Sequence, residues 1–159
     1  MKKFFLLWML IPLLSSCIIG GTTTEDPTRI KTISVTVNAS DWKYTQQSNY
    51  DQFNNNYFYA VVEMPELTSR IFDQGVITAY LVKDRTNKQY ARKHQLPYVM
   101  HVEEEVATGH WNYYTETVDF TYGIGWAEFN YRASDFAYED NESINPVGME
   151  FDIVITYKN

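Results

Sequence analysis

The chain has 159 residues and a formal net charge of −7, from 20 acidic and 13 basic side chains. Without Lys2 and Lys3, which lie in a predicted leader, 11 basic side chains remain against the same 20 acidic ones, a net charge of −9. Such an acidic surface repels phosphates, so nucleic acid is excluded as an expected partner and anionic lipid headgroups are disfavoured.

The first 16 residues have the pattern of an export signal. Two lysines precede residues 4–14, which are all apolar, and two serines follow. The eleven apolar residues are too few to span a bilayer core, which needs about 20. Positive charge, a short apolar run and small residues are typical of a leader that is removed from the mature protein. We therefore predict a cleaved signal peptide at residues 1–16.

Cys17 is the only cysteine, and it directly follows this leader. Leu14-Ser15-Ser16-Cys17 resembles the lipobox of bacterial lipoproteins. The resemblance implies cleavage before Cys17, a diacylglyceryl group on its sulfur and an acyl chain on its new amino group, so the partner would be a membrane, held by several acyl chains. The alternative is an ordinary signal peptide with an incidental cysteine. A lipidated Cys17 leaves no thiol for a disulfide, a redox centre or a nucleophile.

Residues 18–28, "IIGGTTTEDPT", follow with two glycines, three threonines and no apolar period. We interpret residues 17–28 as the lipidated cysteine and a flexible tether, with a root-mean-square reach of about 18 Å. Ile18 is not an aspartate, so the familiar inner-membrane retention signal is absent and an outer-membrane location is expected, with the leaflet left open. Residues 29–159 are then one domain.

The sequence of this domain predicts a series of strands. Apolar and polar residues alternate with the period of a half-buried strand, and residues 75–82 are apolar on both faces, as in a central strand. Pro97 marks a strand start or an edge. A short helical turn is compatible with residues 66–72. The expected strands are 32–38, 57–64, 75–82, 89–93, 96–102, 114–122, 126–132 and 149–157.

Seven or eight one-sided strands joined by polar turns predict an all-β fold. Two packed antiparallel sheets, a single immunoglobulin-like β-sandwich, bury such strands most naturally, and a closed barrel is the alternative. The order of four stretches resembles a group of small exported lipoproteins of Bacteroidetes whose role is uncharacterised: Asp41-Trp42, 64–82, 96–99 and 151–157. The resemblance implies a β-sandwich lipoprotein and carries over no catalytic or binding residue.

Two groups of residues have metal-binding chemistry without metal-site spacing. His101, Glu103 and Glu105 share a face of a predicted strand, with His110 nearby, but the chain has no HExxH or other short ligand pair. Residues 135–146 gather four carboxylates that would suit calcium, Asp135, Glu139, Asp140 and Glu142, but lack the alternation of an EF-hand. We therefore expect a solvated face and an acidic turn, with no metal and no cofactor.

Catalytic patterns are also missing from the sequence. There is no Gly-x-Ser-x-Gly, no supported Ser/His/Asp set and no phosphate-cradling glycine loop. Gly123-Ile124-Gly125 lies between two strands and is interpreted as a turn. The sequence therefore predicts a protein that is not an enzyme.

Aromatic residues form 16% of the chain, and three of them lie on the polar side of their strands. By strand parity, Trp111, Tyr113 and Trp126 face outward, where rings beside carboxylates and amides suit a sugar or a protein surface. A β-bulge would shift the parity and return these rings to the core. Trp42, just past the first strand, is expected in the core.

Two functions are consistent with these features. The first is a membrane-anchored, non-catalytic envelope lipoprotein that binds a glycan or a protein through Trp111, Tyr113 and Trp126. The alternative is a structural or assembly subunit of a larger envelope complex, formed by strand addition at an open sheet edge.

Overall fold

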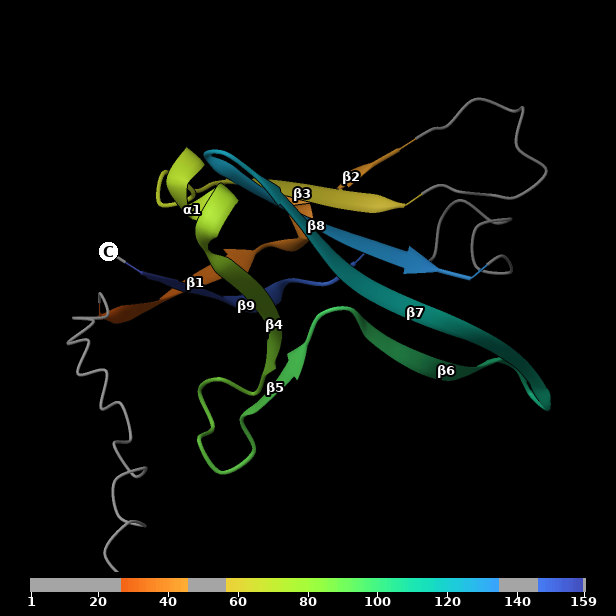
Figure 1. Ribbon diagram of the computed structural model, residues 1–159. Helices are drawn as coiled ribbons and strands as arrows, with labels where there is room; N and C mark the ends of the chain where they lie inside the picture. The colour runs from red at the N-terminus through yellow and green to blue at the C-terminus, as the bar shows by residue number, and fades with distance from the viewer. Residues whose placement is uncertain (1–26, 46–56, 135–145, 159) are drawn as a thin grey trace, which may run out of the picture.

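The computed structural model describes residues 27–45, 57–134 and 146–158. The predicted signal peptide, Cys17, nearly all of the tether and the acidic loop 135–145 lie outside these residues. The described chain forms two antiparallel sheets packed as a sandwich (Figure 1). The all-β, two-sheet prediction is confirmed, and the alternative of a closed barrel is wrong, because the strands divide into two separate sheets.

Sheet A has four strands in the order β1-β9-β4-β5. The first strand of the domain therefore pairs with the last, and β9 lies between two partners. The bounds are β1 Thr28–Val37, β9 Met149–Lys158, β4 Val76–Lys83 and β5 Arg92–Gln95.

Sheet B has five strands in the order β2-β3-β8-β7-β6. The two-residue strand β2 was not predicted, because two residues carry no period. Pro97 lies between β5 and β6, and each of these strands is an edge, as predicted for this proline. The bounds are β2 Lys43–Tyr44, β3 Phe58–Glu63, β8 Trp126–Ala133, β7 His110–Gly123 and β6 Tyr98–Ala107.

The core fills the space between the sheets. Phe129 of β8 and Phe151 of β9 stack at its centre, with ring centroids 3.8 Å apart and an angle of 14° between the planes. Trp42 is buried, as expected, and its indole N–H donates to the carbonyl of Val147 over 3.2 Å. The alternating apolar positions of the predicted strands supply the buried side chains, including Val35, Val37, Ala60, Val118, Ala127, Tyr131, Ile153 and Ile155.

Two short helices accompany the sheets, η1 (Ala39–Asp41) and α1 (Ser69–Gln74). The predicted helical turn at 66–72 begins later, because Thr68 is the N-cap and its hydroxyl accepts a hydrogen bond from the amide of Ile71. α1 covers one end of the sandwich, where Phe72 meets Tyr122 edge-on at 5.9 Å. Within the described part of the chain, no helix is long and apolar enough to cross a bilayer.

Candidate functional site

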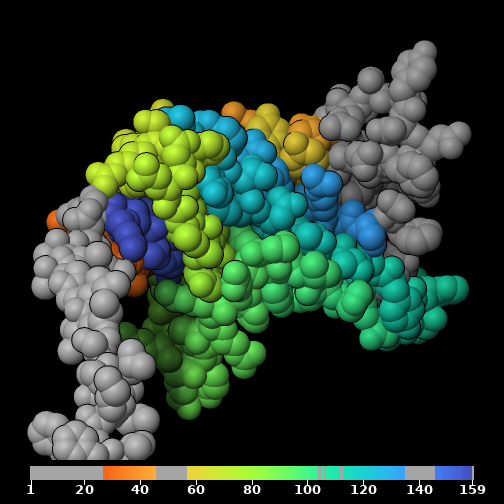
Figure 2. All heavy atoms as spheres, in the orientation of Figure 1, coloured from red at the N-terminus to blue at the C-terminus, as the bar shows by residue number. Residues whose placement is uncertain are grey.

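The strands β6 and β7 continue past the sandwich as a two-stranded ribbon. β8 pairs with β7 only from Glu116 to Gly123, whereas β6 stays paired with β7 as far as His110. We call residues 101–115 the β6–β7 arm. The arm projects from the body of the molecule, at the right of Figure 1 and in green and teal at the lower right of Figure 2.

The tip of the arm is held by local interactions. Gly109 has a φ of 78°, a left-handed conformation that glycine adopts without a steric penalty. Its amide N–H donates to the Glu105 carboxylate over 3.0 Å, and the register shifts between Glu105 and Ala107. Glu105 therefore fixes the turn that ends the arm.

Trp111 and Tyr113 lie on the outer face of the arm, as their parity predicts. Their exposed fractions are 47% and 65%, so the alternative of core rings is wrong for both. Tyr113 lies opposite Glu103 in the strand register and donates its hydroxyl hydrogen to that carboxylate, which raises the pKa of Tyr113. Trp111 lies opposite Glu105. The arm thus pairs each outward ring with an acidic neighbour.

Trp126 also faces outward, with 40% of its surface exposed, but it does not join the other two rings. It lies opposite Gly123 at the far end of β7. Tyr113 is ten residues from Gly123 along the same strand, a path of roughly 33 Å at the usual strand rise. The three rings thus face outward as predicted but do not form one continuous patch, and ligand binding by them stays a prediction.

Trp126 instead packs on the backbone of its cross-strand partner. A Cβ atom built on Gly123 would lie 2.5 Å from Cε2 of the Trp126 indole, so the ring occupies the space above this glycine. An aromatic ring that covers a glycine stabilises a sheet locally. The adjacent turn is the one predicted: Gly125 has a φ of 83°, and its carbonyl accepts from Met64 N–H over 2.8 Å.

The possible metal ligands of the arm have other partners. His101 Nδ1 lies 3.1 Å from the Thr115 hydroxyl, Glu103 accepts from Tyr113, and Glu105 holds the turn. Among the described residues, no three His, Cys, Asp or Glu side chains gather as a metal site. The acidic loop considered for calcium lies outside those residues.

A buried carboxylate on the outer face of sheet A was not predicted. Asp152 of β9 is placed by parity on the polar side of its strand, yet only 3% of its side chain is exposed. The loop between β4 and β5 carries Arg85 to Asp152 Oδ1, at 2.8 Å, and Lys93 of β5 reaches Oδ2 at 2.7 Å. Ser34 of β1 donates to Oδ1 over 2.7 Å.

Opposing effects set the charge of Asp152. Burial favours the neutral acid, but the hydrogen bonds from Lys93, Ser34 and Arg85 outweigh it and lower the pKa of Asp152 to about 2. The hydrogen bond to Asp152 in turn raises the pKa of Arg85. Because both carboxylate oxygens are occupied, we assign this cluster to stability rather than to chemistry.

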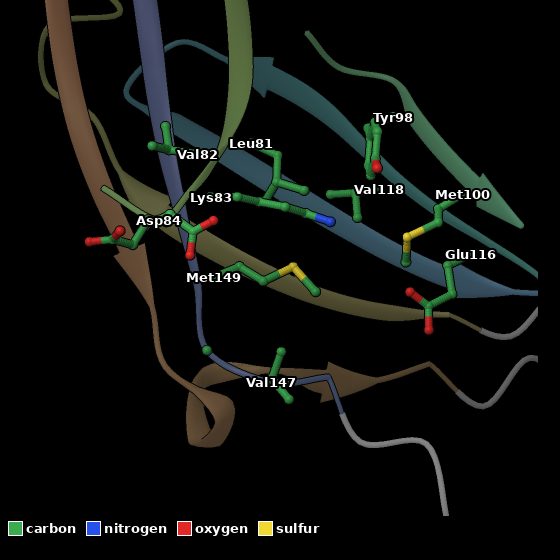
Figure 3. Close-up of a pocket in the computed structure, with 12 residues that line it drawn as sticks. Leu81, Val82, Lys83, Asp84, Tyr98, Met100, Glu116, Val118, Val147 and Met149 are labelled. Carbon is green, nitrogen blue, oxygen red and sulfur yellow. The ribbon is translucent and has the colours of Figure 1, made fainter. Parts of the chain in front are cut away.

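A cleft opens between the two sheets, where β4 and β9 face β6 and β7 (Figure 3). Its volume is about 450 Å³. One sign of this cleft is present in the sequence: Glu116 falls on the inner face of its strand, between apolar residues, where a charge is unusual. Comparison of the chain with protein-family models, with curated proteins and with solved structures gives no match.

Proposed function

We propose that this protein is a non-catalytic interaction module of a bacterial envelope lipoprotein, anchored to the outer membrane through Cys17, which binds a protein partner with the β6–β7 arm. The observation that carries the proposal is the exposure of Trp111 and Tyr113 on a ribbon that consists, in the described part of the chain, of β6 and β7 alone. The signal peptide, the lipobox and the resemblance to Bacteroidetes lipoproteins support the anchor. The immunoglobulin-like strand connection stays a prediction.

The arm has features of a binding element rather than of a structural hairpin. A two-stranded ribbon is marginally stable in water unless its face is covered. Tryptophan and tyrosine contribute much of the energy of protein interfaces, because they bury a large area with few rotatable bonds. Along the arm β6 pairs with β7 alone among the described strands, so its other edge is open to an added strand.

The charge of the arm favours one kind of partner. Residues 103–105 are three consecutive glutamates on the edge strand. Like charges would face each other if two copies paired edge to edge, and charged edges disfavour such self-pairing. An extended, basic segment of another protein would complement the glutamates and cover the two rings.

A glycan is the less favoured ligand. The three rings lie on one outer face as expected, but Trp126 lies over Gly123 at the other end of β7, too far for one sugar ring to contact all three. A protein strand needs only the edge of β6 and the two adjacent rings.

The position of the arm relative to the start of β1 supports a role in which the arm faces away from the membrane. β1 begins at one end of the molecule and the arm tip lies at the opposite end (Figure 1). An anchor attached upstream of β1 would leave the arm directed away from the membrane. An assembly subunit is the second candidate, favoured by the same open edge of β6.

Site-specific photocrosslinking in intact cells tests the proposal. A benzophenone amino acid replaces Tyr113, and the matched control replaces Tyr90, which is 53% exposed on the β4–β5 loop. We expect a discrete protein adduct from position 113 only, identified by mass spectrometry. Adducts shared by both positions, carbohydrate adducts or none would overturn the protein-binding proposal. One partner at fixed stoichiometry across all molecules would favour the assembly role.

The anchor is tested separately with the Cys17→Ser variant. The wild-type chain should partition into the detergent phase and show the mass of a tri-acylated N-terminal cysteine after cleavage. The variant should lose both properties. Detergent partitioning that survives the substitution would show that Cys17 is not the anchor.

A further inference from the structure

The inter-sheet cleft is distinct from the arm, and its lining has a definite chemical character. Its apolar side chains come from both sheets and include Leu81, Met149, Val118 and Met100. Two of these are methionines, whose flexible side chains adapt to ligands of different shape. A cleft of about 450 Å³ falls within the size range of small-molecule sites.

Two opposite charges interrupt this apolar lining. Lys83 follows Leu81 by two residues on β4, and Glu116 precedes Val118 by two on β7, so both share the face of core residues. Figure 3 shows Lys83 extending into the cleft, with Glu116 and Met100 toward its other side. Both charged side chains are half-buried.

Neither charge is neutralised within the described chain. Lys83 Nζ lies 5.1 Å from the centre of the Tyr98 ring, a cation–π contact that orients the ammonium without cancelling it. The ion pairs in the described residues include neither Lys83 nor Glu116. A half-buried charge without an ion-pair partner is unfavourable unless water or a ligand reaches it.

The other acidic groups at the cleft do not change this balance. Glu150 lies 3.4 Å from Arg85 Nε and is therefore paired. Asp84 is exposed at the rim. What remains inside is one cation and one anion beside an apolar lining.

We infer that the cleft binds a small zwitterion with an apolar body, an apolar amino acid or dipeptide. Its carboxylate would meet Lys83, its ammonium would meet Glu116, and its side chains would contact Met100 and Met149. The two charges of such a ligand match the two charges of the cleft, whereas a singly charged molecule would satisfy only one of them and a purely apolar molecule neither.

The test uses the full-length chain in phosphatidylcholine nanodiscs, with ¹³C-labelled methionine methyl groups. Leucyl-phenylalanine is the probe, and its acetylated, amidated analogue is the matched neutral control. Met64 is 1% exposed and lies outside the cleft, so its methyl signal is an internal reference. We expect saturable shifts at Met100 and Met149 with the free dipeptide, and binding about a hundredfold weaker for the analogue, because it lacks both charged contacts and each contributes about a factor of ten.

Two substitutions assign the ends of the ligand. Lys83→Met should remove the preference for a free carboxylate, and Glu116→Gln the preference for a free ammonium, with Lys88→Met on the exposed β4–β5 loop as the matched control. An unchanged Met64 signal shows that each variant is folded. Absence of shifts at Met100 and Met149, equal binding of the neutral analogue, or equal behaviour of the three variants would overturn the inference.

Discussion

The outer face of sheet A and the outer face of the β6–β7 arm both carry carboxylates on strand positions that sequence parity assigns to solvent. On sheet A, Asp152 is enclosed by Arg85, Lys93 and Ser34 and loses contact with water. On the arm, Glu103 and its partner Tyr113 both stay exposed.

The difference arises from what lies above each face. The β4–β5 loop brings Arg85 across β9, so the outer face of sheet A has a cover from the chain itself. Among the described residues, the arm from His110 to Thr115 has β6 beside β7 but not β8. A covered charge contributes to stability, whereas an uncovered ring and carboxylate contribute little to it and remain available to a partner.

The largest expected effect is that of Asp152→Asn. Loss of the carboxylate charge leaves Arg85 and Lys93 without their anion, and removal of one partner from a buried pair is strongly destabilising. Because both cations are partly exposed and regain water, we expect a loss of about 2–3 kcal/mol in the free energy of unfolding. Urea denaturation at pH 7 measures it. Glu103→Gln is the control on the arm. Equal losses in the free energy of unfolding for the two substitutions would contradict the difference between sheet A and the arm.

The stability of the protein at low pH should depend on the same contacts of Asp152. The pKa of Asp152 is about 2 in the folded protein, below its ordinary value of 3.8. A lowered folded-state pKa adds stability in full above the ordinary value, and this contribution disappears as the pH falls from 3.8 toward 2. The contribution is about 2 kcal/mol. Urea midpoints measured between pH 5 and pH 2 should therefore fall more steeply for the wild type than for Asp152→Asn; parallel curves would contradict the assignment.

A smaller effect is expected at the other end of β7. Gly123→Ala places a methyl group where the Trp126 ring lies, so the ring must move. We expect a destabilisation of about 1–2 kcal/mol, as for other overpacked sites. A double-mutant cycle with Trp126→Ala checks the cause, since the alanine at position 123 should be nearly neutral once the ring is absent. Additive effects would show that Trp126 does not cover Gly123.

The smallest effect on stability is expected in the arm. Trp111→Ser and Tyr113→Ser should each change the free energy of unfolding by less than about 0.5 kcal/mol, because both rings are largely in water. The Trp111→Ser substitution should nevertheless abolish the crosslink from position 113. A large loss of stability would mean that the rings support the arm itself.

The inner faces of the strands were predictable from the sequence. Strict alternation identifies Val35, Val37, Phe129, Phe151 and Ile153 as core residues, and each is buried. The parity argument also holds for the exposed rings. Alternation is reliable here because each sheet has one apolar face, so a shift by one residue would expose the whole core.

The contacts between distant segments were not predictable. Asp152 alternates as a solvent residue, and only the fold of the β4–β5 loop brings Arg85 to it. The separation of Trp126 from Tyr113 could be obtained by counting residues back from the turn. Parity alone gives the face on which a ring lies and not its distance along the strand. The cleft depends on the spacing of two sheets, for which Glu116 was the one available sign.

The central place of β9 in sheet A has a consequence for the order in which the molecule can form. Its residues contribute Phe151, Ile153 and Ile155 to the core, and its partner β1 precedes it by more than a hundred residues. Until the ribosome has produced β9, sheet A lacks the strand that joins β1 to β4. Sheet A therefore cannot be completed before residues 149–158 have been synthesised.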